Sequence, residues 1–255
     1  MFTIQDVALQ YDGLKVLDKF SLKAEENQFI SLFGPSGVGK TTILNILARI
    51  LKPKEGYVST DKERLAYVFQ EPRLLPWMTV EQNIEVGLFT FKKDEKWRKQ
   101  IVQQLMPRIG LEEFSNYYPE QLSGGMRQRV SIGRAFAIQP DLILLDEPFS
   151  GLDENLKVEM QDLILSLENW HLCTTVMVTH DMREAIKLSD RIIVLDQRPC
   201  RIILDVIVKK EGKGDVDYQR RLEERIVLAK NKIRRNGEND EKKNFSSYAL
   251  HSIGL

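Results

Sequence analysis

The segment with the clearest chemical capacity is Gly34–Thr41, which reads GPSGVGKT. It matches the phosphate-binding pattern G-x-x-x-x-G-K-[ST], and it lies between an apolar run at 29–34 and an amphipathic run. Backbone N–H groups of such a loop surround a phosphate chain, and the following helix adds the positive end of its dipole. We expect Lys40 to supply a mobile positive charge for the β- and γ-phosphates and the Thr41 hydroxyl to bind Mg²⁺. The candidate phosphate-binding residues are Gly34, Pro35, Ser36, Gly37, Val38, Gly39, Lys40, Thr41 and Thr42.

Two adjacent carboxylates end a second apolar run, LILLDEP at 142–148. A strand that ends in a carboxylate places Asp146 at the edge where parallel sheets bind their ligands, and there it can hold a Mg²⁺ ion through water. Glu147 comes next and is placed to polarise an attacking water, since phosphoryl transfer depends mostly on positioning and charge stabilisation. An acidic turn at a strand end is common by itself, but downstream of a phosphate loop the pair predicts a nucleotide triphosphatase.

A third segment, LSGGMRQR at 122–129, joins a serine and two glycines to a basic helical run at 126–137. Glycine in a helix costs about 1 kcal/mol relative to alanine, so Gly124 and Gly125 are expected where the backbone comes close to another group. With Ser123 they form a second helix N-terminus suited to phosphate. Since one small nucleotide does not need two such ends from one face, this segment is expected to address a nucleotide held elsewhere.

The apolar pattern predicts the elements that position these groups. Strands are expected at 2–9, 29–34, 64–70, 142–146, 174–180 and 191–196, and helices at 41–51, 156–167 and 183–188. Near-continuous apolar strands that alternate with helices indicate a parallel α/β sheet covered on both faces. The stretch at about 78–137 has helical spacing without a convincing strand, so we expect an inserted helical subdomain there. An amphipathic helix is predicted at 215–235, followed by a polar tail with a candidate docking patch at 248–255.

Composition restricts the class of protein. The chain has 255 residues, 42% hydrophobic and 29% charged, which is ample for a packed core, and its 37 basic and 37 acidic residues balance. The zero net charge argues against a dedicated nucleic-acid binder, which usually has a basic excess. Its 2 cysteines fit a reduced intracellular protein better than a disulfide scaffold. With no signal-peptide pattern and no run of about 18 apolar residues, we expect a soluble, cytosolic chain.

These motifs, in this order, make the chain similar to the ABC ATPases over about residues 2–205. The resemblance implies an ATPase domain at 1–205, with a P-loop α/β core, a mainly parallel sheet, an N-terminal antiparallel β part and the inserted helical subdomain. A C-terminal extension at 206–255 would follow. The resemblance also implies that two such domains dimerise head to tail on ATP, so that each LSGGMRQR segment completes the partner's site. ATP and Mg²⁺ are the implied cofactors.

The resemblance assigns roles to single residues as well. Tyr11 lies where the family stacks an aromatic ring on adenine, with Val16 nearby. Gln70 matches the glutamine that senses Mg²⁺ and the attacking water, and Asp153, in SGLD, matches the loop that crosses the dimer interface. His180, in VTHD, matches the switch histidine that contacts the γ-phosphate. The implied catalytic set is Lys40, Gln70, Glu147 and His180; the metal set is Thr41, Gln70 and Asp146; and Tyr11, Val16, Ser123, Gly124, Gly125 and Asp153 join the nucleotide-binding set.

Within the family, EPRLLPWMTVEQNI after Gln70 and QRPCRII at 197–203 resemble the importers of nitrate, sulfonate and taurine, whose relatives include importers of vitamin precursors. That branch implies a peripheral subunit on the cytoplasmic face of the membrane and integral membrane permease subunits that contact Glu71–Thr79. An extracytoplasmic solute-binding protein would be an indirect partner, and no nucleic acid is expected. A core of the helical subdomain is a second interpretation of 74–77, compatible with the first.

Two departures from the family pattern stand out. Arg49 replaces a glycine that is usual in the family. The segment from Lys40 to Gln70 is shorter than expected, so its small β-hairpins are expected to be trimmed. Neither departure touches the phosphates, but both weaken assignment to one solute.

Three other functions use a similar nucleotide-binding core. An ABC ATPase of DNA maintenance carries long coiled coils within the domain, and this chain has no heptad insertion. An ABC protein of translation normally carries two ATPase domains, and here each motif occurs once. A non-catalytic regulator would be indicated by loss of Lys40 or Glu147, and both are present. A transport ATPase is therefore the leading hypothesis.

Overall fold

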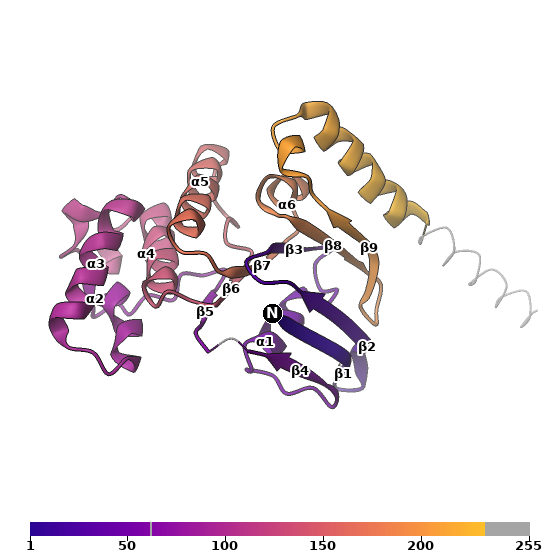
Figure 1. The fold of residues 1–255 in the computed structure, drawn as a ribbon, viewed down its shortest axis with the longest axis horizontal. Helices are drawn as coiled ribbons and strands as arrows, with labels where there is room; N and C mark the ends of the chain where they lie inside the picture. Colours follow the sequence, from indigo (N-terminus) through magenta and orange to yellow (C-terminus); the bar gives the residue numbers. More distant parts are fainter. Residues whose placement is uncertain (62, 233–255) are drawn as a thin grey trace, which may run out of the picture.

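The computed structural model describes residues 1–61 and 63–232, and Figure 1 shows how its elements are arranged. In order, the elements are β1 (Phe2–Tyr11), β2 (Leu14–Ala24), β3 (Phe29–Phe33), α1 (Lys40–Leu47), β4 (Glu55–Thr60), β5 (Leu65–Val68), α2 (Val80–Glu85), η1 (Val86–Thr90), α3 (Glu95–Ile109), η2 (Glu112–Phe114), η3 (Pro119–Gln121), α4 (Gly124–Ala137), β6 (Leu142–Asp146), α5 (Glu154–Trp170), β7 (Thr174–Thr179), α6 (Met182–Leu188), β8 (Arg191–Asp196), β9 (Arg201–Ile207) and η4 (Lys210–Gly212), followed by a helix at 216–232. Among the helices that the structure describes, none combines the length and apolar character needed to cross a membrane.

The main sheet has the strand order β5-β6-β7-β3-β8-β9. The first five strands in this order run parallel to one another, and the last strand, β9, pairs with β8 in the antiparallel direction. The helices α5 and α6 cover one face of this sheet and α1 covers the other (Figure 1). Every residue of β3, β6 and β7 is buried as a result, which fits their nearly continuous runs of apolar residues and threonine. The predicted α/β fold with a mainly parallel sheet is confirmed.

A separate antiparallel sheet at the N-terminus has the order β2-β1-β4, as the predicted antiparallel part requires. Its buried side chains, Phe2 and Ile4 among them, share a core with α1 beneath the main sheet. The apolar pattern indicated β1 but neither β2 nor β4. Register shifts interrupt the alternation along β2, and β4 is a mostly exposed edge strand with little apolar signal. The short segment between Lys40 and Gln70 thus still contains one strand of this sheet, β4, which pairs with β1.

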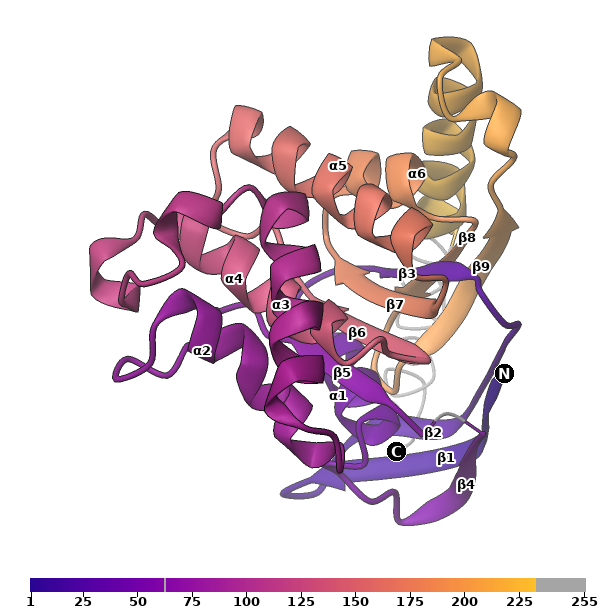
Figure 2. The same cartoon turned by 60° about the vertical axis from the view of Figure 1, so that its left-hand side comes forward.

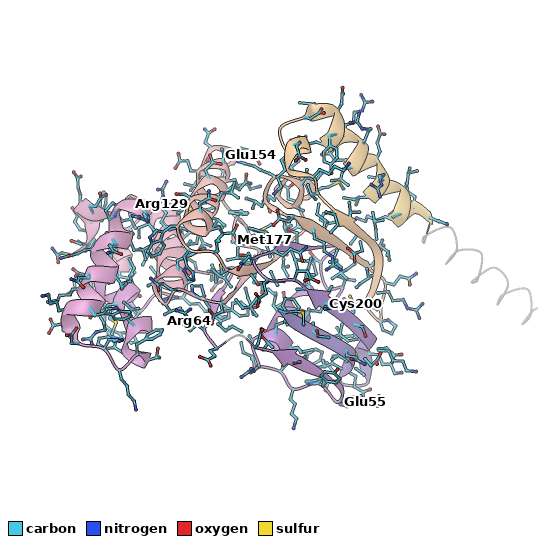
Figure 3. The ribbon with its side chains drawn as sticks, viewed as in Figure 1. Glu55, Arg64, Arg129, Glu154, Met177 and Cys200 are labelled. Carbon is cyan, nitrogen blue, oxygen red and sulfur yellow. The ribbon has the colours of Figure 1, made fainter. Side chains whose placement is uncertain are left out.

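Between β5 and β6 the chain forms only helices over 80–137, which stand together at one end of the molecule in Figure 1 and come forward in Figure 2. Ile84 of α2, Ile109 of α3 and Val130 of α4 are fully buried in one cluster. The same cluster continues through α5 into the main sheet, where Met177 of β7 lies in the middle of the molecule (Figure 3). This continuous core fixes the start of α4 relative to the sheet.

Beyond β9 the chain returns to the main sheet through the helix at 216–232. Ile226 is fully buried in a cluster with Phe33, the last residue of β3. The Lys230 ammonium lies 5.2 Å from the centre of the Phe33 ring, a cation–π contact directly before the phosphate loop. The predicted amphipathic helix is confirmed as far as residue 232. Its last predicted turn and the candidate docking patch at 248–255 lie outside the described residues.

The end of α1 carries a strained residue. Arg49 follows the C-cap residue Ala48 and has a φ of 59°, in the left-handed region where helix ends most often place glycine. Its N–H still donates to the Ile46 carbonyl at 3.0 Å, so the chain turns there as a glycine would allow. A non-glycine residue in this region costs about 1–2 kcal/mol. The departure from the family glycine thus leaves the turn in place at some cost in stability.

Arg49→Gly is expected to raise the free energy of unfolding by up to about 1 kcal/mol, because relief of the left-handed strain exceeds the entropy that glycine adds to the unfolded chain. Thermal unfolding followed by circular dichroism measures the change. Ala48→Gly is the matched control: Ala48 has a φ of −71°, so glycine there should lower the melting temperature. An Arg49→Gly chain that melts below the wild type would contradict the assignment of strain.

Candidate active site

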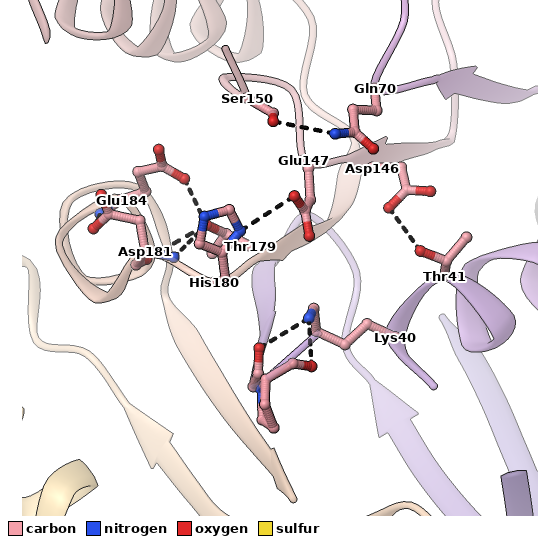
Figure 4. A network of polar contacts seen from close by, with 12 residues as sticks. Lys40, Thr41, Gln70, Asp146, Glu147, Ser150, Thr179, His180, Asp181 and Glu184 are labelled. Carbon is pink, nitrogen blue, oxygen red and sulfur yellow. Dashed lines mark hydrogen bonds and ion pairs between the residues drawn. The ribbon is translucent and has the colours of Figure 1, made fainter. Parts of the chain in front are cut away.

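The phosphate loop joins β3 to α1 at the carboxyl edge of the main sheet (Figure 4). Lys40 opens α1 and is only 5% exposed. Its Nζ donates to the Gly34 carbonyl at 2.8 Å and to the Pro35 carbonyl at 3.0 Å. Burial lowers the pKa of Lys40, an effect that the carboxylates of Glu147 and Asp146 partly oppose. The lysine is therefore held by the carbonyls of its own loop and faced by two negative charges.

Two glycines give this loop its curvature. Gly37 has a φ of 73° and Gly39 a φ of 117°, angles that residues with a side chain rarely adopt. Gly39 is also the N-cap residue of α1, and no side chain caps this helix start. Its first N–H groups, which have no partners within the helix, are thus left without a side-chain acceptor. The arrangement is suited to an anion, as the sequence predicted.

Asp146 is the last residue of β6, and its two oxygens accept different hydrogen bonds. Thr41 Oγ1 donates to Oδ1 at 3.1 Å, and the Tyr67 hydroxyl donates to Oδ2 at 3.1 Å. Burial raises the pKa of Asp146, and these two hydrogen bonds oppose the rise. Tyr67 was not predicted as a site residue, because a tyrosine within an apolar strand gives no sign of the carboxylate that its hydroxyl reaches.

Glu147 leaves β6 with a φ of 46°, and its N–H donates to the Val178 carbonyl at 3.0 Å. Left-handed residues other than glycine are uncommon and gather at functional sites. The turn brings the carboxylate to His180, whose Nδ1 lies 3.2 Å from Glu147 Oε2 (Figure 4). The structure thus brings together the two residues that the sequence named as water-orienting base and switch histidine.

The loop that carries His180 is held from within the chain by Glu184 of α6. Glu184 is 7% exposed and accepts a hydrogen bond from Thr179 Oγ1 at 2.5 Å. Thr179 Oγ1 in turn accepts the Asp181 N–H at 2.9 Å. Burial raises the pKa of Glu184, and the Thr179 hydroxyl opposes that rise. Glu184 was missed in the sequence, since an acidic residue in a first helical turn usually serves only the helix.

Gln70 follows β5, and its Nε2 donates to Ser150 Oγ at 3.1 Å (Figure 4). This hydrogen bond joins the loop after β5 to the loop after β6. The described residues contain no group of three or more His, Cys, Asp and Glu that could hold a metal unaided. The candidate donors at this edge are the Asp146 carboxylate, the Thr41 hydroxyl and the Gln70 amide oxygen. Mg²⁺ takes few such ligands and completes its shell with water and phosphate oxygens. The residues therefore fit Mg²⁺ in company with a bound phosphate chain.

A pocket of about 220 Å³ lies over the phosphate loop. Val16 lines it, as predicted, but Tyr11 is 44% exposed and is not among the lining residues. Tyr11 instead pairs with Leu14 across the β1–β2 turn, and Leu14 does line the pocket. Arg198 is a second lining residue that the sequence did not single out. The lining residues are Leu14, Val16, Ser36, Gly37, Gly39, Lys40, Thr41, Thr42, Glu147 and Arg198.

The LSGGMRQR segment lies outside this pocket, at the start of α4. Ser123 caps α4, its Oγ accepting a backbone N–H of the first turn at 3.2 Å, and Asp153 caps α5 in the same way at 3.0 Å. A Cβ on Gly125 would come within 2.6 Å of the Leu156 side chain, so packing inside the chain explains this glycine. A Cβ on Gly124 would meet no atom within 4 Å. Packing among the described residues therefore explains why position 125 is a glycine, but it does not explain the glycine at position 124.

The segment at 71–79 is held through its backbone. Asn83, which is fully buried, accepts one backbone N–H from this segment and donates to its carbonyls at 2.9–3.1 Å. Arg134 of α4 donates to two further carbonyls of the segment. Leu74 packs against the core, whereas Trp77 is 70% exposed. The interpretation of this stretch as a core therefore holds for Leu74 and is wrong for Trp77.

Residues 17–150, more than half of the chain, match the family described as ABC transporter. The aliphatic sulfonates import ATP-binding protein SsuB 2 of Pseudomonas syringae pv. tomato is 44% identical over 205 residues, covering 80% of this chain and 86% of that protein. SsuB 1 of Pseudomonas savastanoi pv. phaseolicola is 43% identical over 205 residues, covering 80% and 84%. A dimeric structure of the ATP-binding cassette MJ0796, in a post-hydrolysis state bound to ADP and Pi, matches with a TM-score of 0.73 and 30% identity, covering 82% of this chain and 99% of that one.

Tyr67→Phe removes the hydroxyl that donates to Asp146 and keeps the ring. We expect the Mg²⁺ concentration that half-saturates nucleotide binding to rise by about tenfold, because hydrogen bonds that orient a metal-binding carboxylate contribute that much to metal affinity. Titration of a fluorescent nucleotide with Mg²⁺ measures the change. Tyr57→Phe, which loses a hydroxyl bonded to Gln5 at 2.6 Å on the N-terminal sheet, is the matched control. A wild-type Mg²⁺ dependence in Tyr67→Phe would remove Tyr67 from the site.

Proposed function

Because the chain belongs to the ABC transporter family, we propose that it is the ATP-hydrolysing subunit of an import system, which dimerises head to tail on ATP and drives a separate permease. One observation carries the proposal: the phosphate loop, Asp146, Glu147 and His180 meet at one sheet edge, while Ser123 and Gly124 lie outside their pocket. The first group suits hydrolysis, and the second suits a phosphate held by another chain. In this proposal the ATPase domain is 1–205, with the helical subdomain at about 78–137 inserted, and 206–255 is an extension.

In the proposed reaction, Lys40 exchanges the loop carbonyls that it now contacts for phosphate oxygens of ATP. Glu147 orients the attacking water, and His180, beside it, contacts the γ-phosphate and keeps the Glu147 carboxylate in place. When bound, Mg²⁺ would offset the negative charge on the reacting phosphate oxygens. The residues that would hold the ion are Thr41, Gln70 and Asp146.

The base end of the nucleotide falls beside the β1–β2 turn in this proposal. Val16 and Leu14 line the pocket there, and the Tyr11 ring is exposed next to Leu14. An aromatic ring with a free face can stack on a base, and such stacking contributes about 1–3 kcal/mol per base. The exposure of Tyr11 therefore supports its role toward adenine.

A second copy of the chain completes the site. The space over Gly124 and the N-terminus of a 14-residue helix suit the γ-phosphate of a partner's ATP. Gln128 of the same helix donates to the Pro148 carbonyl at 2.8 Å, next to Glu147. A movement of α4 on contact with a partner would therefore be transmitted to the loop that carries Glu147. The dimeric state of the similar MJ0796 cassette with ADP and Pi supports this arrangement. Asp153, at the start of α5, is assigned to the interface.

The permease contact falls on Glu71–Thr79. Trp77 offers an exposed aromatic surface there, on a backbone that Asn83 and Arg134 hold in place. A permease bound at this segment makes the chain a peripheral subunit at the cytoplasmic face of the membrane, with an extracytoplasmic solute-binding protein as an indirect partner. The names of the two SsuB relatives favour aliphatic sulfonates among the solutes of this importer group.

Glu147→Gln keeps the size of the side chain and removes the base. We expect ATP binding to persist, turnover to fall by more than about a hundredfold, since general-base catalysis contributes about 10²–10⁴-fold, and an ATP-bound dimer to accumulate. Phosphate release and gel filtration with ATP and Mg²⁺ measure both effects. Glu113→Gln, an exposed neutralisation in the helical segment, is the control. Wild-type turnover in Glu147→Gln would exclude Glu147 as the base.

Ser123→Arg places a bulky side chain where a partner's phosphate would approach. Binding of ATP to the monomer should change little, because the phosphate loop lies elsewhere, but dimerisation and hydrolysis should be lost. Wild-type activity per subunit should also rise with protein concentration, since dimer formation obeys mass action. Ser166→Arg, on the exposed face of α5, is the matched control.

Mixing the Ser123→Arg chain with a Lys40→Ala chain provides a sharper measurement. We expect each chain to be inactive alone, and a mixed dimer contains one face with an intact phosphate loop and an intact Ser123. Partial recovery of hydrolysis is expected in the mixture. Normal hydrolysis by Ser123→Arg alone, or a wild-type specific rate independent of concentration across the dimerisation range, would show that the site is complete within one chain.

A further inference from the structure

The turn between β8 and β9 packs against the phosphate loop. A Cβ on Gly34 would lie 2.5 Å from the Leu195 carbonyl oxygen, at the end of β8. A Cβ on Gly39 would lie 3.0 Å from Val16 and 3.5 Å from Cys200. The Cys200 N–H donates to the Val16 carbonyl at 2.8 Å, which fixes the turn to β2. Gly34 thus packs closely against β8 and Gly39 against β2, while Cys200 of the turn is in van der Waals contact with Gly39.

Cys200 itself serves as packing. It is 1% exposed, and burial raises the pKa of its thiol to about 12, so it stays neutral at physiological pH. Figure 3 shows it near the N-terminal sheet, at the turn of the β8–β9 hairpin. Its small buried side chain lets the turn approach the loop closely and leaves the neighbouring Arg198 at the rim of the pocket.

Arg198 is the charged residue of this turn. Its Nε donates to the Gly37 carbonyl at 2.9 Å. A Cβ on Gly37 would lie only 2.4 Å from the Arg198 Nη2, so the guanidinium fills the space beside this glycine. It lines the same pocket as Lys40, Thr41 and Glu147. No ion pair joins Arg198 to any described residue, and the single hydrogen bond above uses one of its five N–H donors. A guanidinium with free donors and no paired carboxylate thus stands at the pocket that the phosphates are to fill.

We propose that Arg198 is a further nucleotide-binding residue, whose guanidinium binds the phosphate chain of ATP together with Lys40. The inference rests on the proposed function and adds a residue from the far end of the ATPase domain to its site. The bond to the Gly37 carbonyl anchors the guanidinium before ATP arrives, so little side-chain freedom is lost on binding. Its planar fork suits phosphate oxygens, whereas Lys40 acts as a point charge.

Equilibrium binding of fluorescent ATP and ADP to the full-length protein tests the assignment. Arg198→Ala should raise the Kd for both nucleotides by about 10- to 100-fold, the range for one lost charge-assisted hydrogen bond. Arg198→Gln should lose nearly as much affinity, because its amide can still reach the Gly37 carbonyl but carries no charge. Arg198→Lys should retain part of the affinity. Arg201→Ala is the matched control: it removes an equal charge from the exposed face of the same hairpin and should bind like the wild type.

Circular dichroism establishes that each variant is folded, and Arg198→Gln and Arg198→Lys replace the alanine variant if that one unfolds. Wild-type Kd values in Arg198→Ala would overturn the proposal. So would wild-type affinity in Arg198→Gln, since Arg198 would then only brace the loop. A wild-type chain that binds no ATP would instead overturn the proposed function itself, which keeps the two failures distinct.

Discussion

The parallel pairing of β6, β7 and β3 brings the carboxyl ends of three neighbouring strands to one edge of the main sheet. In this register Asp146 lies opposite Val178, and Phe33 lies opposite Thr179. The loops that follow the strands therefore start at nearly the same level, side by side. Backbone hydrogen bonds inside an apolar core fix that level, so it does not depend on the polar groups themselves. The residues that follow the three strands are Gly34, Glu147 and His180.

The charges at this edge compensate one another. Burial acts against the charged forms of Lys40 and Asp146, lowering one pKa and raising the other, and the opposite charges nearby oppose both effects. A buried charge without a partner is strongly destabilising, so each of these groups depends on the others. Tyr67 and Thr41 add hydrogen bonds that satisfy both oxygens of Asp146. ATP with Mg²⁺ would enter a set of groups that are already oriented.

The helix α4 joins the parts of the molecule that must respond to one another. Its first residues do not line the pocket of their own chain, Gln128 bonds the loop after β6, and Arg134 bonds the segment at 71–79. A helix is stiff along its length, so a shift at its N-terminus moves both contacts together. In a head-to-tail dimer this connects nucleotide bound between the subunits with the surface proposed for the permease.

Local sequence patterns were enough to predict the buried parallel strands, the phosphate loop, the strand-end carboxylates and the helix found at 216–232. Each depends on apolar periodicity or on residue types at fixed spacing, and the fold confirmed the elements. Tertiary structure alone decided the pairing of the edge strands β2, β4 and β9, which were not among the strands expected from the apolar pattern. It also decided the contacts of Tyr67 and Arg198, because a side chain's partner across 79 or 161 residues leaves no trace in local spacing. Arg198 reaches the phosphate loop only because β8 lies beside β3, a neighbour that chain order does not reveal.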